Sequence, residues 1–460
     1  MRDTETVITC DIKSGESRFN VYLAIFIAYL GPATAGFVVG WSSPSLVLLR
    51  DPDTGISLTE DQGRWLASLT PLGAAIGPLV SGYLLDSLGR RRTFLLHHVM
   101  FLVGWGLMCT KTLWIMYTAR LLMGMAVGIS LAVTSMYIGE MVDDSIRSTI
   151  NCMYPVFNKF PLILTFGIGP HISYHNLIFI CSVPSLAFMF LYKMLPESPL
   201  FLFLKNRDSE GIETLSWLRQ LPESSVIDEA KSIKNSLSDK EEGSWANLFF
   251  RRSNLRAMMI VGSLQFFWQY SWGTVVIAYA QPILLQTGLS FSSSLCAWVM
   301  AIMTWIGASL APVLVRSWGY KTSLMVSSTV CTLSMGTCAY FLGICLTGDN
   351  SPLVQWSVLI SQILYTISNY SSYYPVSISL LGEYFEPSMK AKASTIITCV
   401  LCLESSFAVY IFPLFLRTFD LSITYWFSFA ILFLGTMFVS IFIPETSGLS
   451  FAQIQEVLHR

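Results

Sequence analysis

The sequence is short of charge. Of its 460 residues, only 12% are Asp, Glu, Lys or Arg, whereas 53% are hydrophobic. A soluble domain carries about 25% charged residues, so this supply cannot cover a globular surface of the same size. The composition also excludes a disordered chain and a coiled coil. With a net charge of −1 there is no basic surplus to attract nucleic acid. We therefore expect an all-α membrane protein with many spans.

The sequence also gives no sign of a metal or catalytic centre. Its 10 cysteines lie mostly inside apolar runs, which favours small core residues over metal ligands. The five histidines lie near the ends of apolar runs or in the tail, without a nucleophile beside them. We expect no cofactor, no bound metal and no enzymatic activity.

Apolar runs long enough to cross a membrane, about 20 residues, occur twelve times. The predicted spans are residues 21–44, 64–85, 94–110, 113–137, 149–172, 177–195, 255–288, 292–315, 323–346, 353–381, 392–415 and 424–443. The charged stretch between the sixth and seventh spans predicts a cytosolic linker of short helices. The expected division is an N-terminal segment 1–20, a six-helix bundle 21–195, the linker 196–252, a second bundle 253–446 and a tail 447–460.

Basic residues predict the orientation. The loops on the same side as the linker hold most of the Lys and Arg, including Arg90, Arg91, Arg92 and Arg147. The opposite loops hold few. Because short loops rich in Lys and Arg stay in the cytosol, we expect a multi-pass protein of the plasma membrane with both termini in the cytosol.

The two halves of the sequence repeat one pattern. Glu140 precedes Arg147 by the same spacing that separates Glu383 from Lys390, after the fourth and tenth spans. A Pro-Glu pair also ends the sixth and twelfth spans. A duplicated unit of six spans predicts two bundles with a binding site between them near the midplane, as in carriers that rock between two states.

The repeated charges predict a cytosolic gate. Opposite charges at the cytosolic helix ends can latch the two bundles together, and several weak pairs bias such an equilibrium by a few kcal/mol. The alternative is that the basic clusters only hold loops inside. The predicted gate residues are Asp86, Arg90, Arg91, Glu140, Arg147, Glu197, Lys321, Glu383, Lys390 and Glu445.

Several motifs together resemble a known family. They are Asp86 with Gly89-Arg90-Arg91, Arg120 with Gly124, Tyr137-Ile138-Gly139-Glu140 with Arg147, Pro196-Glu197-Ser198-Pro199, and Pro444-Glu445-Thr446. Over nearly its whole length the chain resembles the sugar porter family of the major facilitator superfamily, and within it the insect facilitated trehalose and hexose transporters. The resemblance implies twelve helices, a central cavity lined by spans 1, 4, 7 and 10, and alternating access.

Sugar chemistry indicates where a substrate would bind. Sugar hydroxyls both donate and accept hydrogen bonds, so their recognition favours amides and an aromatic face. Gln265 and Gln269 lie four residues apart and share one helical face. The alternative is that they only join helices. Chemistry and resemblance together assign substrate binding to Gln265, Gln269, Tyr270, Thr274, Tyr279, Thr304 and Ser405.

The chain departs from the family at this site. Trp268 and Trp272 stand where the family has Gln and Gly, and Thr274 stands where it has Asn. The leading hypothesis is facilitated transport of trehalose or a hexose. Two alternatives stay open: a divergent carrier of a less polar solute, and a transport-inactive sugar sensor on the same fold.

Two charges inside the predicted spans bear on energy coupling. Proton-coupled sugar porters carry an Asp after a Gly-Tyr pair in the first span, whereas this chain has Gly40-Trp41-Ser42-Ser43, which favours a uniporter. Lys159 and Glu404 lie near the middle of spans 5 and 11. Each costs about 2.5 kcal/mol or more unless paired or hydrated, so they line a water path or pair with a neighbouring helix. The expected partners are a small sugar and the lipid bilayer, with no nucleic acid and no obligate protein partner.

Overall fold

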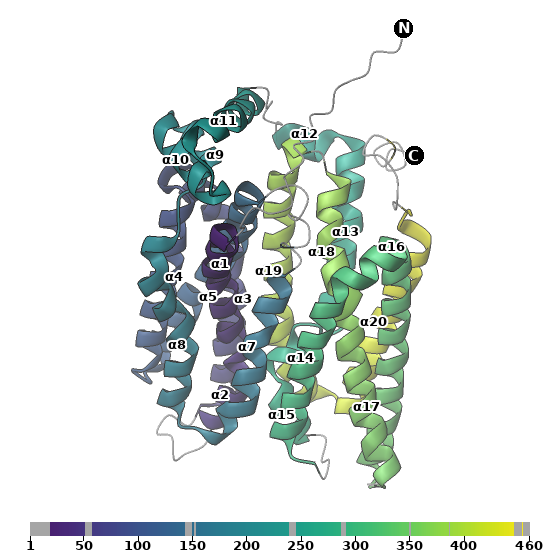
Figure 1. Cartoon of the computed structure of the whole chain (residues 1–460). Helices are drawn as coiled ribbons and strands as arrows, with labels where there is room; N and C mark the ends of the chain where they lie inside the picture. The colour runs from purple at the N-terminus through teal and green to yellow at the C-terminus, as the bar shows by residue number, and fades with distance from the viewer. Residues whose placement is uncertain are drawn as a thin grey trace.

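The computed structural model describes residues 19–50, 58–142, 150, 153–238, 245–286, 291–348, 351–385, 387–445 and 453. Within these ranges the regular structure is helical, and the helices form two bundles side by side (Figure 1). The helices of the first bundle are α1 Phe19–Gly40, α2 Ser42–Leu48, α3 Glu60–Leu88, α4 Arg90–Met108, α5 Leu113–Met141, α7 Tyr154–Ile168 and α8 Tyr174–Leu191.

Four short helices form an insert between the bundles in sequence. They are α9 Pro199–Leu204, α10 Asp208–Arg219, α11 Glu223–Ser238 and α12 Trp245–Phe250. All four lie at one end of the molecule (Figure 1). We call this end the insert end, and the other, which carries α2 and α15, the opposite end. Asn20 of α1 donates to the carbonyl of Trp217 at 2.7 Å, which fastens α10 to the first bundle.

The second bundle contains the longest helix. Its elements are α13 Arg252–Tyr270, α14 Val275–Ala278, α15 Ala280–Gln286, α16 Ser293–Leu346, α17 Pro352–Ser368, the π-helical turn η4 Asn369–Tyr373, α18 Tyr374–Tyr384, α19 Pro387–Thr418 and α20 Leu421–Phe442. Seven helices of the described chain are long and apolar enough to span a membrane. The longest of these, α16, contains two spans. The helices α4 and α7 and the broken runs α13–α15 and α17–α18 supply one span each, so the predicted twelve-span architecture is confirmed.

Three predicted spans differ in detail. The run 255–288 was expected to be one helix, but it is divided into α13, α14 and α15. The runs 292–315 and 323–346 were expected to be separated by a loop, whereas α16 continues through both apart from a kink at Gly319, where φ is 76° and ψ 175°. Gly89, at the corresponding turn of the first bundle, has φ 85° and ψ 176°. The internal repeat therefore extends to the backbone.

Glycines bring α3 and α5 into close contact. A Cβ on Gly124 would lie 2.1 Å from the carbonyl oxygen of Thr70, and one on Gly73 would lie 2.2 Å from that of Leu121. Without a hydrophobic driving force between helices in lipid, such small residues supply the close packing that holds spans together. The α3–α5 pair therefore forms a rigid part of the first bundle.

Candidate functional site

The candidate substrate site begins with the break between α13 and α14. Residues 271–274 are non-helical, and Trp272 has a φ of +67°, a rare conformation for a bulky residue. The Trp272 side chain is buried among Phe412, Phe415 and Phe427. Tertiary packing therefore stabilises the unusual backbone, and strain held in this way is typical of functional sites.

Two tyrosines satisfy the carbonyls that the break releases. The Tyr365 hydroxyl donates to the Ser271 carbonyl at 3.2 Å, and the Tyr370 hydroxyl donates to the Gly273 carbonyl at 3.3 Å. Tyr370 belongs to the π-helical turn η4, and such turns occur often at functional sites. The Trp268 indole also donates to Asn369 Oδ1 at 2.6 Å. The broken span 7 and the π-turn of span 10 therefore form one hydrogen-bonded unit.

The two predicted glutamines lie in this unit. Gln265 Nε2 donates to the Ser377 hydroxyl at 3.1 Å, and Gln269 Oε1 accepts from the Thr274 hydroxyl at 2.9 Å. Both side chains are at most 1% exposed. Gln265 Oε1 and Gln269 Nε2 are buried without a hydrogen-bond partner in the described chain. An unpaired buried amide atom costs about 1–3 kcal/mol, so a ligand hydroxyl would be a favourable partner.

The other predicted binding residues are more scattered. Tyr270 is near Phe266 and Phe407, which are 43% and 52% exposed, so it lies on a different face of α13 from the glutamines. Thr304 donates to the carbonyl of Met300 in its own helix, and Ser405 is 8% exposed. The structure brings Gln265, Gln269 and Thr274 together and leaves Tyr270 apart from them.

Lys159 of α7 is a buried cation that faces the same unit. Its side chain is 8% exposed, and its Nζ lies 5.0 Å from the ring centroid of Tyr370 and 5.8 Å from that of Tyr374. A buried cation over aromatic rings gains about 0.5–2 kcal/mol. Sequence reasoning noted the charge of Lys159 but missed these rings, because the contact joins different bundles.

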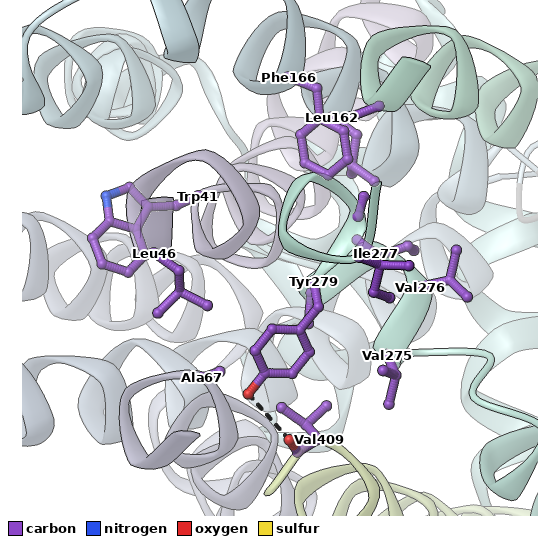
Figure 2. Close-up of a cluster of buried hydrophobic side chains, with 14 of the residues drawn as sticks. Trp41, Leu46, Ala67, Leu162, Phe166, Val275, Val276, Ile277, Tyr279 and Val409 are labelled. Carbon is purple, nitrogen blue, oxygen red and sulfur yellow. Dashed lines mark hydrogen bonds between the residues drawn. The ribbon is translucent and has the colours of Figure 1, made fainter. Parts of the chain in front are cut away.

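The two bundles are in contact at the opposite end of the molecule. Tyr279 is 3% exposed and donates to the Val409 carbonyl at 3.1 Å, while residues 275–277 belong to the same buried hydrophobic cluster as Leu162 and Phe166 (Figure 2). Ser43 of the first bundle accepts from the Gln281 backbone N–H at 3.0 Å. Several hydrogen bonds, ion pairs and ring contacts among the described residues join the two bundles at this end or between the middle parts of the helices. They are Gln281–Ser43, Ser406–Ser68, Cys399–Ala75, Arg417–Asp61, Arg417–Glu60, Arg64–Tyr410, Trp65–Tyr410, Phe160–Trp305, Lys159–Tyr370 and Lys159–Tyr374.

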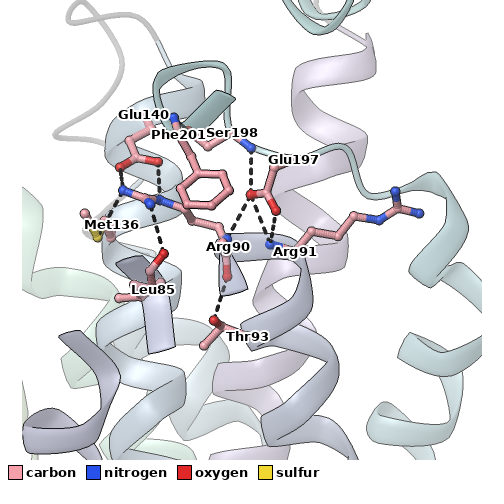
Figure 3. A network of polar contacts seen from close by, with 10 residues as sticks. Leu85, Arg90, Arg91, Thr93, Met136, Glu140, Glu197, Ser198 and Phe201 are labelled. Atoms are coloured by element: carbon pink, nitrogen blue, oxygen red, sulfur yellow. Dashed lines mark hydrogen bonds and ion pairs between the residues drawn. The ribbon is translucent and has the colours of Figure 1, made fainter. Parts of the chain in front are cut away.

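The insert end carries a buried ionic network. Arg90 donates to Glu140 from Nε at 2.8 Å and from Nη2 at 2.5 Å, and from Nη1 to the Leu85 carbonyl at 3.2 Å (Figure 3). The side chains of Arg90 and Glu140 are 1% and 7% exposed. Such a bidentate pair fixes the geometry as well as the charge.

Glu197 caps the start of α4 in the same network. Its carboxylate accepts from the backbone N–H of Arg90 at 2.8 Å, of Arg91 at 3.2 Å and of Ser198 at 3.0 Å (Figure 3). A carboxylate at a helix N-terminus also interacts favourably with the positive end of the helix dipole. Gly89 is required beside it, because a Cβ there would lie 2.5 Å from Glu197 Oε2.

The predicted gate therefore takes a form that differs from the sequence expectation. The pairs were expected to latch one bundle to the other, but Arg90, Glu140 and Glu197 interact within the first bundle and the segment that leads to α9. Of the remaining gate residues, Asp86 and Lys390 are exposed, and Lys321 and Glu383 are half-buried. Glu445 lines a cavity of about 420 Å³ with residues 315–320. Arg147 lies outside the described residues.

The buried Arg120 of α5 contacts three other helices. The sequence placed it in a motif but did not predict these contacts. Arg120 of α5 donates to the carbonyl of Leu66 at 3.1 Å, to that of Val38 at 2.9 Å and to the Ser42 hydroxyl at 2.6 Å. Val38 and Ser42 flank the junction between α1 and α2. The guanidinium therefore satisfies backbone groups where the first span bends, a role that its place in a motif did not reveal.

The fold and these sites define a multi-pass membrane protein of two six-span bundles joined by a helical insert. Residues 24–458 match the family model described as "Sugar (and other) transporter", and the chain belongs to this family. The Facilitated trehalose transporter Tret1 of Polypedilum vanderplanki is 27% identical over 443 residues, which cover 94% of this chain and 87% of that protein. The Tret1 of Anopheles gambiae is 25% identical, and the match covers 94% of this chain but 55% of that relative, so the chain spans about half its length.

Solved structures share the fold. The inward open conformation of the xylose transporter XylE from E. coli gives a TM-score of 0.78 at 18% identity, over 95% of this chain and 99% of that chain. XylE bound to 6-bromo-6-deoxy-D-glucose gives 0.73 at 20% identity, over 95% and 99% of the two chains. The predicted sugar porter family and the expectation of transport rather than catalysis are therefore confirmed.

Proposed function

We propose that this chain moves trehalose or a hexose across the plasma membrane by facilitated diffusion. The observation that carries the proposal is the hydrogen-bonded unit of span 7 and span 10. Gln265 and Gln269 are buried there, and each keeps one amide atom without a hydrogen-bond partner among the described residues. Sugar hydroxyls supply both the donor and the acceptor that these atoms need. The names of the insect relatives support trehalose as the first candidate.

Alternating access follows from the way the bundles meet. The opposite end is closed by Tyr279 and by the Gln281–Ser43 contact, while the Arg90 and Glu197 network lies within one bundle. The bundles can therefore rock about their central contacts without breaking that network. Basic residues at the insert end support a cytosolic position for this end and for both termini.

Uniport is the simpler mechanism for this chain. The junction of α1 and α2 carries Trp41, Ser42 and Ser43 and no carboxylate. Glu404 Oε2 is buried without a hydrogen-bond partner in the described chain, so this residue is the candidate if a proton is coupled.

The test is uptake into proteoliposomes that contain the purified full chain. The panel is radiolabelled trehalose, glucose, fructose and sorbitol. We expect saturable uptake of trehalose or a hexose, and we expect Gln269→Ala to raise its KM about tenfold, since a lost hydrogen bond costs about 1–1.5 kcal/mol.

Gln362→Ala is the matched control. Gln362 of α17 is another buried glutamine of the second bundle, and it donates to Tyr425. Its Oε1 is likewise without a hydrogen-bond partner in the described chain, so Gln362 matches Gln269 but forms no described hydrogen bond within the unit of span 7 and span 10. Its replacement should lower stability without a change in KM. Folded protein without saturable flux of any sugar would overturn the proposal and favour the inactive sensor. Equal KM effects of the two variants would remove Gln269 from the site.

A further inference from the structure

Lys159 is the charged group that the proposed transport of a neutral sugar leaves unexplained. It lies on α7 of the first bundle and is 8% exposed. No described carboxylate forms an ion pair with it, and no described group forms a hydrogen bond with it. A lysine ammonium has three donors and a full charge, so its burial without an anion is costly in a membrane.

The aromatic rings around Lys159 belong to the hydrogen-bonded unit of span 7 and span 10, in the second bundle. Its Nζ lies over the faces of Tyr370 and Tyr374, whose ring centroids are 5.8 Å apart and whose planes are inclined at 64°. Trp268 lies 4.5 Å from Tyr374, ring centroid to ring centroid. Among the described residues, the titratable groups in cation–π contact with the ammonium are thus two phenols. The Tyr370 hydroxyl donates to the Gly273 carbonyl, and the ammonium lies over the ring face.

This arrangement provides part of what an anionic sugar needs. A carboxylate would form short, charge-assisted hydrogen bonds with the ammonium. Aromatic faces suit the C–H side of a sugar ring. Asn369 Nδ2, beside Trp268, is buried without a hydrogen-bond partner in the described chain and supplies one more donor. A cationic sugar would be repelled, and a neutral one would leave the charge unpaired.

We propose that Lys159, with the faces of Tyr370 and Tyr374, forms a charge-selective subsite that prefers a sugar bearing a carboxylate, such as a hexuronate, over the neutral hexose. The inference rests on the proposed sugar transport and names the substrate class of the same site. Lys159 is then a specificity-determining residue that contacts the carboxylate.

The test uses three sugars that share the same pyranose ring and differ in the charge of the group at C6. They are D-glucuronate, D-glucose and 6-amino-6-deoxy-D-glucose, each assayed for saturable uptake by the full chain in proteoliposomes. We expect the lowest KM for glucuronate and the highest for the amino sugar. Lys159→Gln should raise the KM for glucuronate about tenfold or more while that for glucose changes little, and Lys159→Arg should restore the preference.

A distant lysine is the matched control. Lys231 of α11 is an exposed lysine of the insert, and Lys231→Gln should leave all three KM values unchanged. Saturable glucose uptake without a preference for glucuronate in the unaltered protein would overturn the inference and keep the proposed function. No saturable flux of trehalose, hexose or hexuronate would overturn the proposed function itself. An equal loss of rate for every sugar in Lys159→Gln, with unchanged KM ratios, would show that Lys159 only braces the two bundles.

Discussion

Replacement of Arg90 tests the insert-end network quantitatively. Arg90→Ala removes two hydrogen bonds to Glu140 and one to the Leu85 carbonyl, and it leaves the Glu140 carboxylate, 7% exposed, without its cation. Removal of one partner of a buried pair costs about 3–5 kcal/mol. The ring of Phe201, 5.1 Å from the Arg90 guanidinium carbon, loses its cation as well. Arg90→Lys keeps the charge but loses the fork geometry, so an intermediate loss is expected.

Lys321 at the corresponding turn of the second bundle is the comparison. It is half-buried and forms no ion pair with a described residue, so Lys321→Ala should change stability by about 0.5 kcal/mol or less. The measurement is the thermal unfolding midpoint of detergent-purified protein, followed by fluorescence-detected size exclusion. Uptake at matched surface expression should fall further for Arg90→Ala than for Lys321→Ala.

A double-mutant cycle makes this prediction sharper. Arg90→Ala with Glu140→Ala removes both charges, so the double variant should be less destabilised than the sum of the single variants by more than about 1 kcal/mol. Additive effects would show that the pair contributes little. Equal or reversed effects of Arg90→Ala and Lys321→Ala on stability and uptake would refute the reasoning.

Three further predictions follow from local geometry. Gly89→Ala should lower the free energy of unfolding by about 1–3 kcal/mol, because φ is +85° and a Cβ would meet Glu197; the unfolding midpoint measures this loss. The control is Gly82→Ala, whose Cβ would meet nothing within 4 Å, and it should unfold near the midpoint of the unaltered protein. Tyr279→Ala should weaken the seal at the opposite end, so that cysteines introduced at that end react faster with a membrane-impermeant maleimide, whereas Tyr279→Phe keeps the packing and should react at nearly the original rate. Glu404→Gln should leave the pH dependence of uptake and its response to an imposed proton gradient unchanged in a uniporter; abolition of either would assign proton coupling to this carboxylate.

The span pattern was predictable because hydrocarbon thickness imposes its length on the sequence. Runs of about 20 apolar residues were sufficient to find the spans, and the repeated Gly turn before Arg90 appears again as the kink at Gly319. The break after Tyr270 was not predictable. It depends on hydroxyl groups of Tyr365 and Tyr370, which are about a hundred residues away and bond to carbonyls that a continuous helix would use itself.

For the candidate site, the sequence indicates the residue types but not their arrangement. Gln265 and Gln269 share a helical face by spacing alone, and the structure places both in the buried unit. Tyr270, one residue further, was assigned to the same site, yet the turn of the helix directs it toward Phe407. The rings over Lys159 belong to another bundle, so no local pattern could reveal them.

Counterflow is the measurement that tests alternating access most directly. Proteoliposomes that contain the purified chain are loaded with unlabelled sugar, either trehalose or the best substrate of the uptake panel, and diluted into a trace of the same labelled sugar. A carrier with one site that faces each side in turn should accumulate label transiently above its equilibrium level, and the overshoot should vanish without internal sugar. Uptake that rises only to equilibrium, whatever the internal sugar, would contradict alternating access by this chain.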